Sequence, residues 1–240
     1  MRLLDLTLPT PEENLALDEA LLEEAESSAA PVETLRLWET AHSLIVVGRG
    51  SQLEVEVDQS ASAAGTGIPI LRRTSGGASI ITGPGCLMYA VVLSYASRPA
   101  LRSIDEAHRF VMGTIAASLS AIVPGVARRG ICDLTLGDKK FSGNSLRCKK
   151  RTLLYHGTLL YDFPLELVAR LLKMPPRVPD YRAGRGHDQF VTNLPLSRAV
   201  LVNTLVTAFD AVEPRSEWPR ELTNRLVNEK YSQREWNYQR

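Results

Sequence analysis

The sequence contains few cysteines, and their spacing is wrong for the common cysteine-based sites. Cys86, Cys132 and Cys148 lie far apart in a chain of 240 residues. An odd number at wide spacing is a poor disulfide framework, and the lack of any Cys-x-x-Cys pair excludes the usual structural zinc sites. We therefore expect a protein of a reducing compartment, the cytoplasm.

Long apolar runs and an excess of one charge are also missing. No stretch reaches the roughly 20 apolar residues that span a bilayer. An early acid, Asp5, argues against a secretory signal peptide. The formal net charge is +1, which does not predict a general nucleic-acid footprint. We expect neither membrane nor nucleic-acid binding, although basic clusters at 72–73, 128–129 and 149–151 could meet one anionic ligand or an acidic partner.

Several common catalytic motifs are absent as well. No Gly-x-x-x-x-Gly-Lys-Ser/Thr sequence occurs, so a P-loop is not expected. The glycine pairs at 48–50 and 184–186 lack the third glycine of a dinucleotide fingerprint. Neither Ser75 nor Ser142 lies in Gly-x-Ser-x-Gly, and the four histidines are not spaced as metal ligands.

What is present is a mixture of strands and helices in one domain. Hydrophobic content of 44% and charged content of 23% suit a sizeable core. Alternation and turn signals predict strands over 2–8, 34–38, 43–48, 68–72, 87–94, 133–136 and 153–160. Capping and periodicity predict helices from Thr10, over 58–64, from Ser103 to about 122, over 162–173 capped by Asp162, from Ser197 and, last, from Trp218. The pattern indicates an α+β fold with a mixed, largely antiparallel sheet.

A glycine-punctuated turn, Arg72-Arg73-Thr74-Ser75-Gly76-Gly77-Ala78, is the first candidate site. Gly76 and Gly77 permit a backbone whose N–H groups face an anion. Arg73 could hold a carboxylate or phosphate through two hydrogen bonds. The alternative is a hairpin turn with two solvated arginines.

Lys140 precedes a second small-residue turn at Ser142-Gly143. As a cation it could stabilise negative charge that develops on a phosphate or a carbonyl oxygen. The alternative is an inert lysine at a hairpin tip. Together the two turns suggest a site for a nucleotide-linked carboxylate, and hence acyl activation or acyl transfer.

Four blocks resemble the lipoate–protein ligase and lipoyl- or octanoyl-transferase family. In order along the chain they are Gly48-Arg49-Gly50-Ser51-Gln52, Arg72-Arg73-Thr74-Ser75-Gly76-Gly77, Gly137-Asp138-Lys139-Lys140-Phe141-Ser142-Gly143-Asn144 and His156-Gly157-Thr158-Leu159-Leu160. The blocks keep the order and spacing of the family over nearly the whole chain.

The resemblance implies a fold and a reaction. The fold is shared with biotin ligases and is like that of class II aminoacyl-tRNA synthetases: a mixed sheet with helices on one side, with 1–240 forming one catalytic domain. The reaction attaches lipoate or octanoate to a lysine of a lipoyl carrier domain, either the E2 component of a 2-oxoacid dehydrogenase or the glycine cleavage H protein. ATP with Mg²⁺ and an acyl-adenylate such as lipoyl-AMP are implied, with no metal site in the protein itself.

The resemblance also implies residue roles. Lys140 matches the essential lysine at the mixed anhydride, and the segment around it includes Ser142 and Gly143. Arg73, Ser75, Gly76 and Gly77 match the loop at the acyl carbonyl and phosphate. Trp38 matches an aromatic near the acyl tunnel. His156 matches a histidine near the adenylate, with a packed structural histidine as the alternative. Arg182 and Arg185 lie in a basic loop, 179–193, that could clamp the adenylate or meet the carrier domain.

The chain departs from the family pattern at two loop positions. Ala78 and Thr82 stand where the family commonly has a third glycine and a histidine, which affects substrate preference and adenylation. A segment resembling the end of the catalytic domain lies at 231–238, where an accessory domain follows in full-length ligases. We therefore expect an accessory subunit, unaided adenylation, or a pre-activated donor.

Two alternatives to ATP-dependent ligation stay open. One is an ATP-independent transferase that holds the acyl group on a cysteine thiolate, for which Cys132 is the candidate. The other is a non-catalytic subunit that binds lipoyl domains.

Overall fold

The main sheet of the protein is mixed and has eight strands. The structure of the protein is a computed structural model that describes residues 1–58 and 67–239. The strands run in the order β11 (Glu213–Pro214), β1 (Arg2–Asp5), β2 (Thr34–Trp38), β6 (Cys86–Ser94), β10 (Thr152–Leu160), β9 (Lys139–Cys148), β8 (Asp133–Leu136) and β7 (Val126–Arg129). Strand β1 pairs in parallel with β2 and β11, and the other neighbours are antiparallel. The predicted α+β fold with a mixed, largely antiparallel sheet is confirmed.

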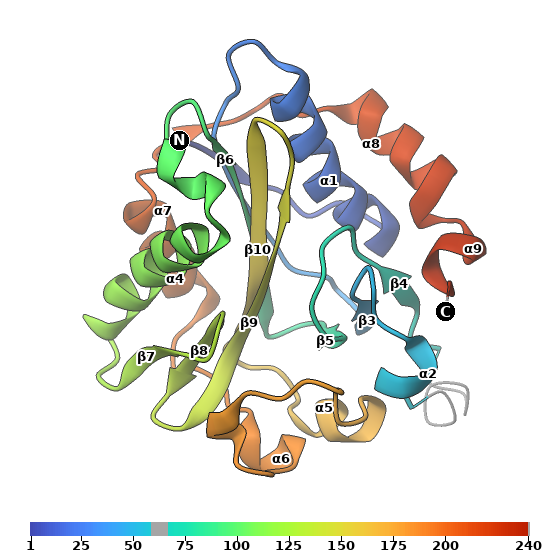
Figure 1. Cartoon of the computed structure of the whole chain (residues 1–240), viewed down its shortest axis with the longest axis vertical. Coiled ribbons are helices and arrows are strands. Elements are labelled where there is room, and N and C mark those ends of the chain that lie inside the picture. The colour runs from blue at the N-terminus through green and yellow to red at the C-terminus, as the bar shows by residue number, and fades with distance from the viewer. Residues whose placement is uncertain (59–66, 240) are drawn as a thin grey trace.

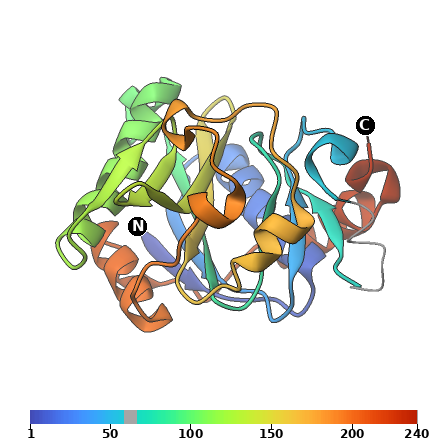
Figure 2. The ribbon, with the colours of Figure 1, turned by 90° about the horizontal axis from the view of Figure 1, so that it is seen from below.

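A smaller sheet lies beside the main one (Figure 2) and carries the glycine-punctuated turn at 72–78, called the glycine loop from here on. Its order is β4 (Ile70–Arg72), β3 (Leu44–Val47) and β5 (Ile80–Thr82). Strand β3 pairs in parallel with β4 and antiparallel with β5. The segment 73–79 therefore leaves the sheet at one end of β4 and returns through β5, a strand that the sequence did not predict.

Helices cover both faces of the main sheet, so the expectation of helices on one side is wrong. Tyr89 and Val91 of β6 pack in the core with α4 (Ile104–Ser120) and α7 (Arg198–Ala208). Ala90 and Val92 face the other way and pack with α1 (Pro11–Ser27). Figure 1 shows α4 and α7 on one side of β6 and β10, with α1 on the other. The reason is that β6 and β10 are buried along their whole length, which requires cover on both faces.

The predicted capping box at Thr10 is confirmed, and at Ser103 only one of the two hydrogen bonds of a capping box is present. Thr10 accepts a hydrogen bond from the Glu13 N–H at 3.2 Å, and the Glu13 carboxylate accepts one from the Thr10 N–H at 2.9 Å. Ser103 accepts from the Glu106 N–H at 3.5 Å. The Glu106 carboxylate, however, pairs with Arg109 one turn along the helix.

The predicted cap at Asp162 is wrong. Helix α5 (Glu166–Leu171) begins after Leu165. The Asp162 N–H instead donates to the carbonyl of Gly85 at 3.1 Å, in a turn where Gly85 has a φ of +85°. This turn fixes residue 162 before the helix starts.

The remaining differences are short elements and element ends. The sequence did not predict β7, α2 (Leu53–Glu56), η1 (Pro99–Arg102), or η2 (Asp180–Arg182) and α6 (His187–Phe190) within the basic loop. The helix predicted from Trp218 begins at Arg220 as α8 (Arg220–Leu226), and η3 (Val227–Tyr231) and α9 (Arg234–Asn237) follow it. Residues 59–64 of the predicted helix 58–64 lie outside the described residues. Within 1–58 and 67–239, no helix combines the length and apolar character needed to cross a bilayer.

Candidate active site

The glycine loop is held between β9 and the turn after β3. Gly77 has a φ of +84°, a conformation that favours glycine. Its carbonyl accepts a hydrogen bond from the Ser51 hydroxyl at 3.0 Å, and the carbonyl of Gly76 accepts one from Ser145 of β9 at 2.8 Å. Gly48 lies directly against the backbone of Gly77, so close that a Cβ at position 48 would overlap the Gly77 carbonyl. Gly48 and Gly77 are thus the two glycines that this close backbone approach requires.

Arg73 shapes this loop from the inside. Its side chain is buried and donates to Ser75 Oγ at 3.1 Å and to the carbonyls of Val46 at 3.2 Å, Ala78 at 3.0 Å and Gly76. Burial lowers the pKa of Arg73 to about 10, so it is still a cation at neutral pH. The alternative of a solvated arginine is therefore wrong for Arg73.

The loop leaves backbone donors open. Among the described residues, no protein acceptor is bonded to the N–H groups of Gly76, Gly77 and Ala78. All three residues are exposed. Adjacent free N–H groups beside a buried guanidinium form a concavity suited to an anion.

A series of buried, hydrogen-bonded side chains runs from Ser75 in the loop to Arg36 in the core. His156 Nε2 lies 2.5 Å from Ser75 Oγ, and its Nδ1 lies 3.4 Å from Asp18 Oδ2. Asp18 Oδ1 is 2.5 Å from Nη1 of Arg36. With Nδ1 protonated towards the carboxylate, His156 accepts the hydroxyl hydrogen of Ser75 at Nε2. Ser75 Oγ is therefore oriented by its hydrogen bonds with two residues, Arg73 and His156.

Sequence reasoning missed Asp18 and Arg36. Asp18 is buried in α1 beside Leu17 and Leu21, and the polar Asn14 one turn earlier is buried as well. A carboxylate among the leucines of this helix was the signal, because a buried charge needs a partner. Arg36 lies within the fully buried strand β2 and is that partner.

Lys140 lies within strand β9 and not at a hairpin tip. Its Nζ is 2.7 Å from Asp133 Oδ1, and its side chain is 28% exposed. The other oxygen of Asp133 accepts from the Tyr181 hydroxyl at 2.8 Å. Gly143 gives the amine room, since a Cβ there would lie 3.0 Å from Nζ. The ammonium is thus oriented yet accessible.

The predicted turn at Ser142-Gly143 is also wrong, because both residues belong to β9. A register shift between β8 and β9 lies next to Lys140. Ser142 is buried, and its hydroxyl accepts from the Asn144 amide at 3.0 Å. Ser142 therefore supports the strand.

The structure brings the two predicted motifs together on β9. This strand carries Lys140 at its start and Ser145, which bonds the glycine loop, further along. Ser145 is opposite His156 of β10. The same pair of strands thus holds the lysine, the loop and the histidine in one arrangement.

Trp38 lies at the end of β2 and is fully buried. Its ring lies 5.2 Å from the Arg36 guanidinium. Within the described residues its Nε1 has no hydrogen-bond partner. A buried indole N–H without an acceptor is costly, which makes Trp38 a candidate to meet a polar atom of a ligand.

The basic loop runs beside Lys140. The Thr192 N–H donates to the carbonyl of Lys140 at 2.9 Å, and Arg185 pairs with Asp138 at 2.6 Å. Arg182 is buried over Phe190, with 4.5 Å from its Cζ to the ring centre. Its Nη2 lacks an acceptor in the described part of the chain. Arg182 is therefore a ready anion donor, whereas Arg185 is already paired.

The cysteine candidate is held as a thiol. Cys132 Sγ donates to the carbonyl of Asn144 at 2.9 Å. Burial and the neighbouring Asp133 raise the pKa of Cys132, which outweighs the lowering effect of Lys140. Cys86 is fully buried, which raises its pKa to about 12. Neither thiol is an activated nucleophile in this structure.

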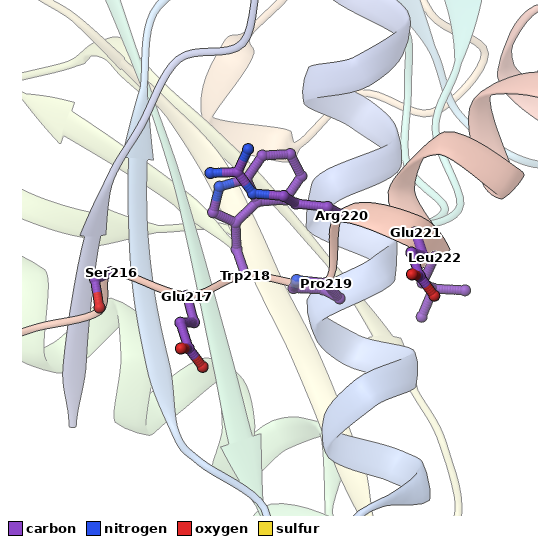
Figure 3. Close-up of a pocket in the computed structure, with 7 residues that line it drawn as sticks. All are labelled: Ser216, Glu217, Trp218, Pro219, Arg220, Glu221 and Leu222. Atoms are coloured by element: carbon purple, nitrogen blue, oxygen red, sulfur yellow. The ribbon is translucent and has the colours of Figure 1, made fainter.

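Neither a metal cluster nor a surface pocket competes with this site in the part of the chain that the structure describes. Across 1–58 and 67–239, no group of three or more His, Cys, Asp or Glu side chains could hold a metal ion. A surface pocket lies at residues 216–222 (Figure 3), where the Trp218 ring lies 4.8 Å from the guanidinium of Arg220. None of the predicted site residues lines that pocket.

Comparisons with known proteins give a family match over most of the chain. The family model for the lipoyl protein ligase A/B catalytic domain matches residues 10–210. An Aeropyrum pernix protein assigned as a lipoate-protein ligase A is 32% identical over 71% of this chain and 61% of its own length. The octanoyltransferase LipM of Geobacillus kaustophilus is 26% identical over 100% of this chain and 98% of its own.

Solved structures show the same fold. A bi-partite lipoate protein ligase from Thermoplasma acidophilum, studied with its E2 lipoyl domain, has a TM-score of 0.80 at 25% identity, covering 99% of this chain and 95% of that one. A lipoate-protein ligase A bound with ATP has a TM-score of 0.79 at 25% identity, covering 99% and 98%. The chain spans between 45% and 61% of the length of the first curated relatives that it matches.

Proposed function

The chain belongs to the lipoyl protein ligase A/B catalytic domain family, and on this basis we propose that it attaches lipoate or octanoate, through an acyl-adenylate, to a lysine of a lipoyl carrier domain. The carrier is the E2 component of a 2-oxoacid dehydrogenase complex or the glycine cleavage H protein. The family contains enzymes named as ligases and as octanoyltransferases. The choice between the two therefore depends on the residues of this chain.

The observation that carries the proposal is the position of Lys140 on β9, the strand whose Ser145 also bonds the glycine loop. When the carrier amine attacks the carbonyl carbon of a mixed anhydride, negative charge develops on the carbonyl oxygen. AMP then leaves as the new amide bond forms, and the attacking nitrogen loses a proton. A fixed ammonium at Lys140 and the open N–H groups of Gly76 and Gly77 supply stabilisation for such charge.

The chain also fits the nucleotide part of this donor. Arg182 presents a buried Nη2 without an acceptor, and an unpaired buried donor of this kind favours a phosphate oxygen. Trp38 offers a second open donor, Nε1, which we assign to the acyl part of the donor and not to the nucleotide. Mg²⁺ would arrive with ATP as part of that substrate.

Thioester transfer is the second candidate, supported by the similarity to octanoyltransferases. It requires a thiolate, and the raised pKa of Cys132 opposes one in the free protein. A non-catalytic carrier-binding subunit is the third, and the bi-partite organisation of the Thermoplasma relative keeps it open. The paired, accessible Lys140 favours catalysis over binding alone.

The test is an acylation assay read by intact mass. The purified protein is incubated with an apo lipoyl domain and lipoate, with and without Mg-ATP, and separately with lipoyl-adenylate or an octanoyl thioester. We expect a lipoyl mass increase with lipoyl-adenylate, and also with Mg-ATP if adenylation needs no second chain. Acylation from the thioester alone would favour the transferase, and no acylation from any donor would reject both enzymatic proposals.

The neighbouring lysine provides a matched control. Lys140→Ala should reduce transfer from lipoyl-adenylate by about 100-fold or more, the usual effect of removing a transition-state donor. Lys139, which is exposed in the same strand, should tolerate Lys139→Ala within about twofold, in line with other exposed sites. Equal rates in the two variants would contradict a catalytic role for Lys140.

A further inference from the structure

The residues at the end of β4 and in the glycine loop alternate between two surroundings. Arg73 and Ser75 face the candidate site, where they bond the loop and His156. Arg72 and Thr74 face the opposite way, towards the C-terminal residues and Glu19. Arg72 is the last residue of β4, so the contacts that hold Arg72 also fix the point from which the glycine loop leaves the strand.

Arg72 ties three segments together through backbone carbonyls. Its Nη1 donates to Gly48 at 2.6 Å and to Ser51 at 2.8 Å, the turn that backs the loop. Its Nε donates to Trp236 at 3.1 Å and its Nη2 to Gln239 at 2.7 Å. The side chain is buried, so these bonds are made away from water.

The backbone of Arg72 is bonded to the same C-terminal residues. Its N–H donates to Asn237 Oδ1 at 2.9 Å, and its carbonyl accepts from Trp236 Nε1 at 2.8 Å. Figure 1 shows α9 beside β4. The strand that delivers the glycine loop is therefore bonded on its outer edge by side chains of α9.

Glu19 is a second connection between the loop and the C-terminal residues. Its buried carboxylate accepts from the Thr74 hydroxyl at 3.0 Å, from Lys230 Nζ at 2.8 and 2.7 Å, and from the Tyr231 hydroxyl at 2.7 Å. Lys230 also lies 4.1 Å from the centre of the Trp236 ring. The contacts close into one network that runs from Thr74 through Glu19, Lys230 and Trp236 back to Arg72.

We propose that residues 230–239 form a C-terminal clamp, and that the clamp positions the glycine loop for the acyl donor through Arg72 and Glu19. Arg72, Thr74, Glu19 and Trp236 are positioning residues, because their contacts reach the site only through neighbouring residues of the loop and through the turn at 48–51. This inference rests on the proposed function of the loop. Its physical basis is that donors placed to within about half an ångström are needed for efficient stabilisation of a transition state.

The test compares two tryptophan variants by amide hydrogen exchange. Trp236→Phe keeps the ring over Lys230 and removes the N–H that bonds Arg72. Trp218→Phe makes the same chemical change in the surface pocket of Figure 3, away from the loop. The reporters are the Arg73 N–H, bonded to Val47 at 2.9 Å, and the Arg49 N–H, bonded to Ser75 at 2.8 Å.

We expect Trp236→Phe to speed exchange at both reporters by roughly tenfold, the effect of losing one hydrogen bond. Core amides of β10 should not change, and Trp218→Phe should leave both regions as in the wild type. Thr74→Val, which removes only the bond to Glu19, should also speed exchange at the Arg73 reporter. Unchanged reporters in Trp236→Phe, or equal acceleration in the loop and in β10, would overturn the clamp.

A kinetic readout separates this inference from the proposed function. With lipoyl-adenylate, Trp236→Phe should raise KM for the acyl donor by about fivefold or more while KM for the carrier domain stays within twofold, because the lost contact orders only the donor loop. If the wild-type protein transfers no acyl group, the proposed function fails, while the exchange experiment still decides whether the clamp holds the loop. Equal changes in both KM values would contradict positioning.

Discussion

At the scale of single residues, the environment of Cys132 distinguishes two ways of holding an acyl group. A thioester route needs the sulfur as a thiolate, whereas adenylate chemistry does not use it. Burial and Asp133 keep the thiol protonated, and its hydrogen is donated to the carbonyl of Asn144. A hydroxyl can make that same bond.

We therefore predict that Cys132→Ser retains acyl transfer from lipoyl-adenylate to within about threefold, as expected of a position outside the chemistry. The measurement is the initial rate of acceptor mass change. Cys148→Ser, at the half-buried cysteine that ends β9, is the matched control. A loss of 100-fold or more in Cys132→Ser alone would instead assign the sulfur as the acyl carrier.

Single residues also show what the sequence could reveal of the site. The positions of Arg73, Ser75, His156 and Lys140 came from motifs and a family resemblance, and the structure places them in one region. Asp18 and Arg36 could not be found from motifs, because their pairing joins a helix and a strand that are separate in the sequence. Only the burial of a charge on an apolar face points to such a pair.

At the scale of elements, strands β9 and β10 approach unusually closely at Gly157. A Cβ at this position would overlap Asn144 Oδ1 and lie 2.8 Å from the carbonyl of Gly143. Asn144 in turn accepts from the Tyr89 hydroxyl at 2.5 Å and donates to the carbonyl of Cys132 at 2.8 Å. The absence of a side chain at Gly157 of β10 thus lets Asn144 of β9 reach across that strand to Tyr89 of β6.

We predict that Gly157→Ala lowers the free energy of unfolding by about 2 kcal/mol, the cost of forcing an extra methyl group into a packed site. Gly113→Ala is the control, because Gly113 is exposed within α4 and a Cβ there meets no atom within 4 Å. It should raise stability by about 1 kcal/mol, since alanine is the better helix former. Urea unfolding measures both, and a stabilising Gly157→Ala would disprove the close approach.

Elements were predicted best where local chemistry dominates. The Thr10 capping box follows from neighbouring residues, and the structure has it. Strands β5 and β7 are only three and four residues long and depend on partners elsewhere in the sheets. Short strands of this kind carry too few residues for a clear alternation.

At the scale of the whole molecule, the clamp network makes stability depend on pH. Burial raises the pKa of Glu19, but the charge of Lys230 and the bonds from Lys230, Tyr231 and Thr74 outweigh this and hold it below the ordinary value of 4.5. A carboxyl whose pKa is lower in the folded state stabilises that state fully above its unfolded pKa. The contribution is lost as the pH falls through the folded pKa.

Glu19→Gln should therefore lower the free energy of unfolding at pH 7 by roughly 2 kcal/mol, the size expected for hydrogen bonds to a charged group. The difference from wild type should be smaller at pH 3.5, because this pH lies below the unfolded pKa of glutamate, about 4.3, where the contribution of the ionised network begins to be lost. Urea unfolding at the two pH values measures it. Glu12→Gln, at a half-exposed acid in the first turn of the same helix, is the control, and an equal deficit at both pH values would contradict the ionised network.

The overall architecture was predictable only in class. Composition and the succession of strands and helices indicated a mixed α+β sheet, which the structure has. The strand order and the cover on both faces depend on contacts between distant segments, such as β1 lying between β2 and β11. Local patterns carry no information on such pairings.

The clamp also has a consequence for the order in which the protein is made. A ribosome delivers the glycine loop and then Lys140 well before residues 230–239, and at 5–20 residues per second the delay from the loop to the clamp is roughly 10–30 s. During synthesis, the nascent chain therefore carries every proposed catalytic group while the bonds from Trp236 and Asn237 to Arg72 are still missing. Acyl transfer would reach full efficiency only once α9 has emerged and docked, so a chain terminated before residue 230 would be a poor catalyst with an intact set of site residues.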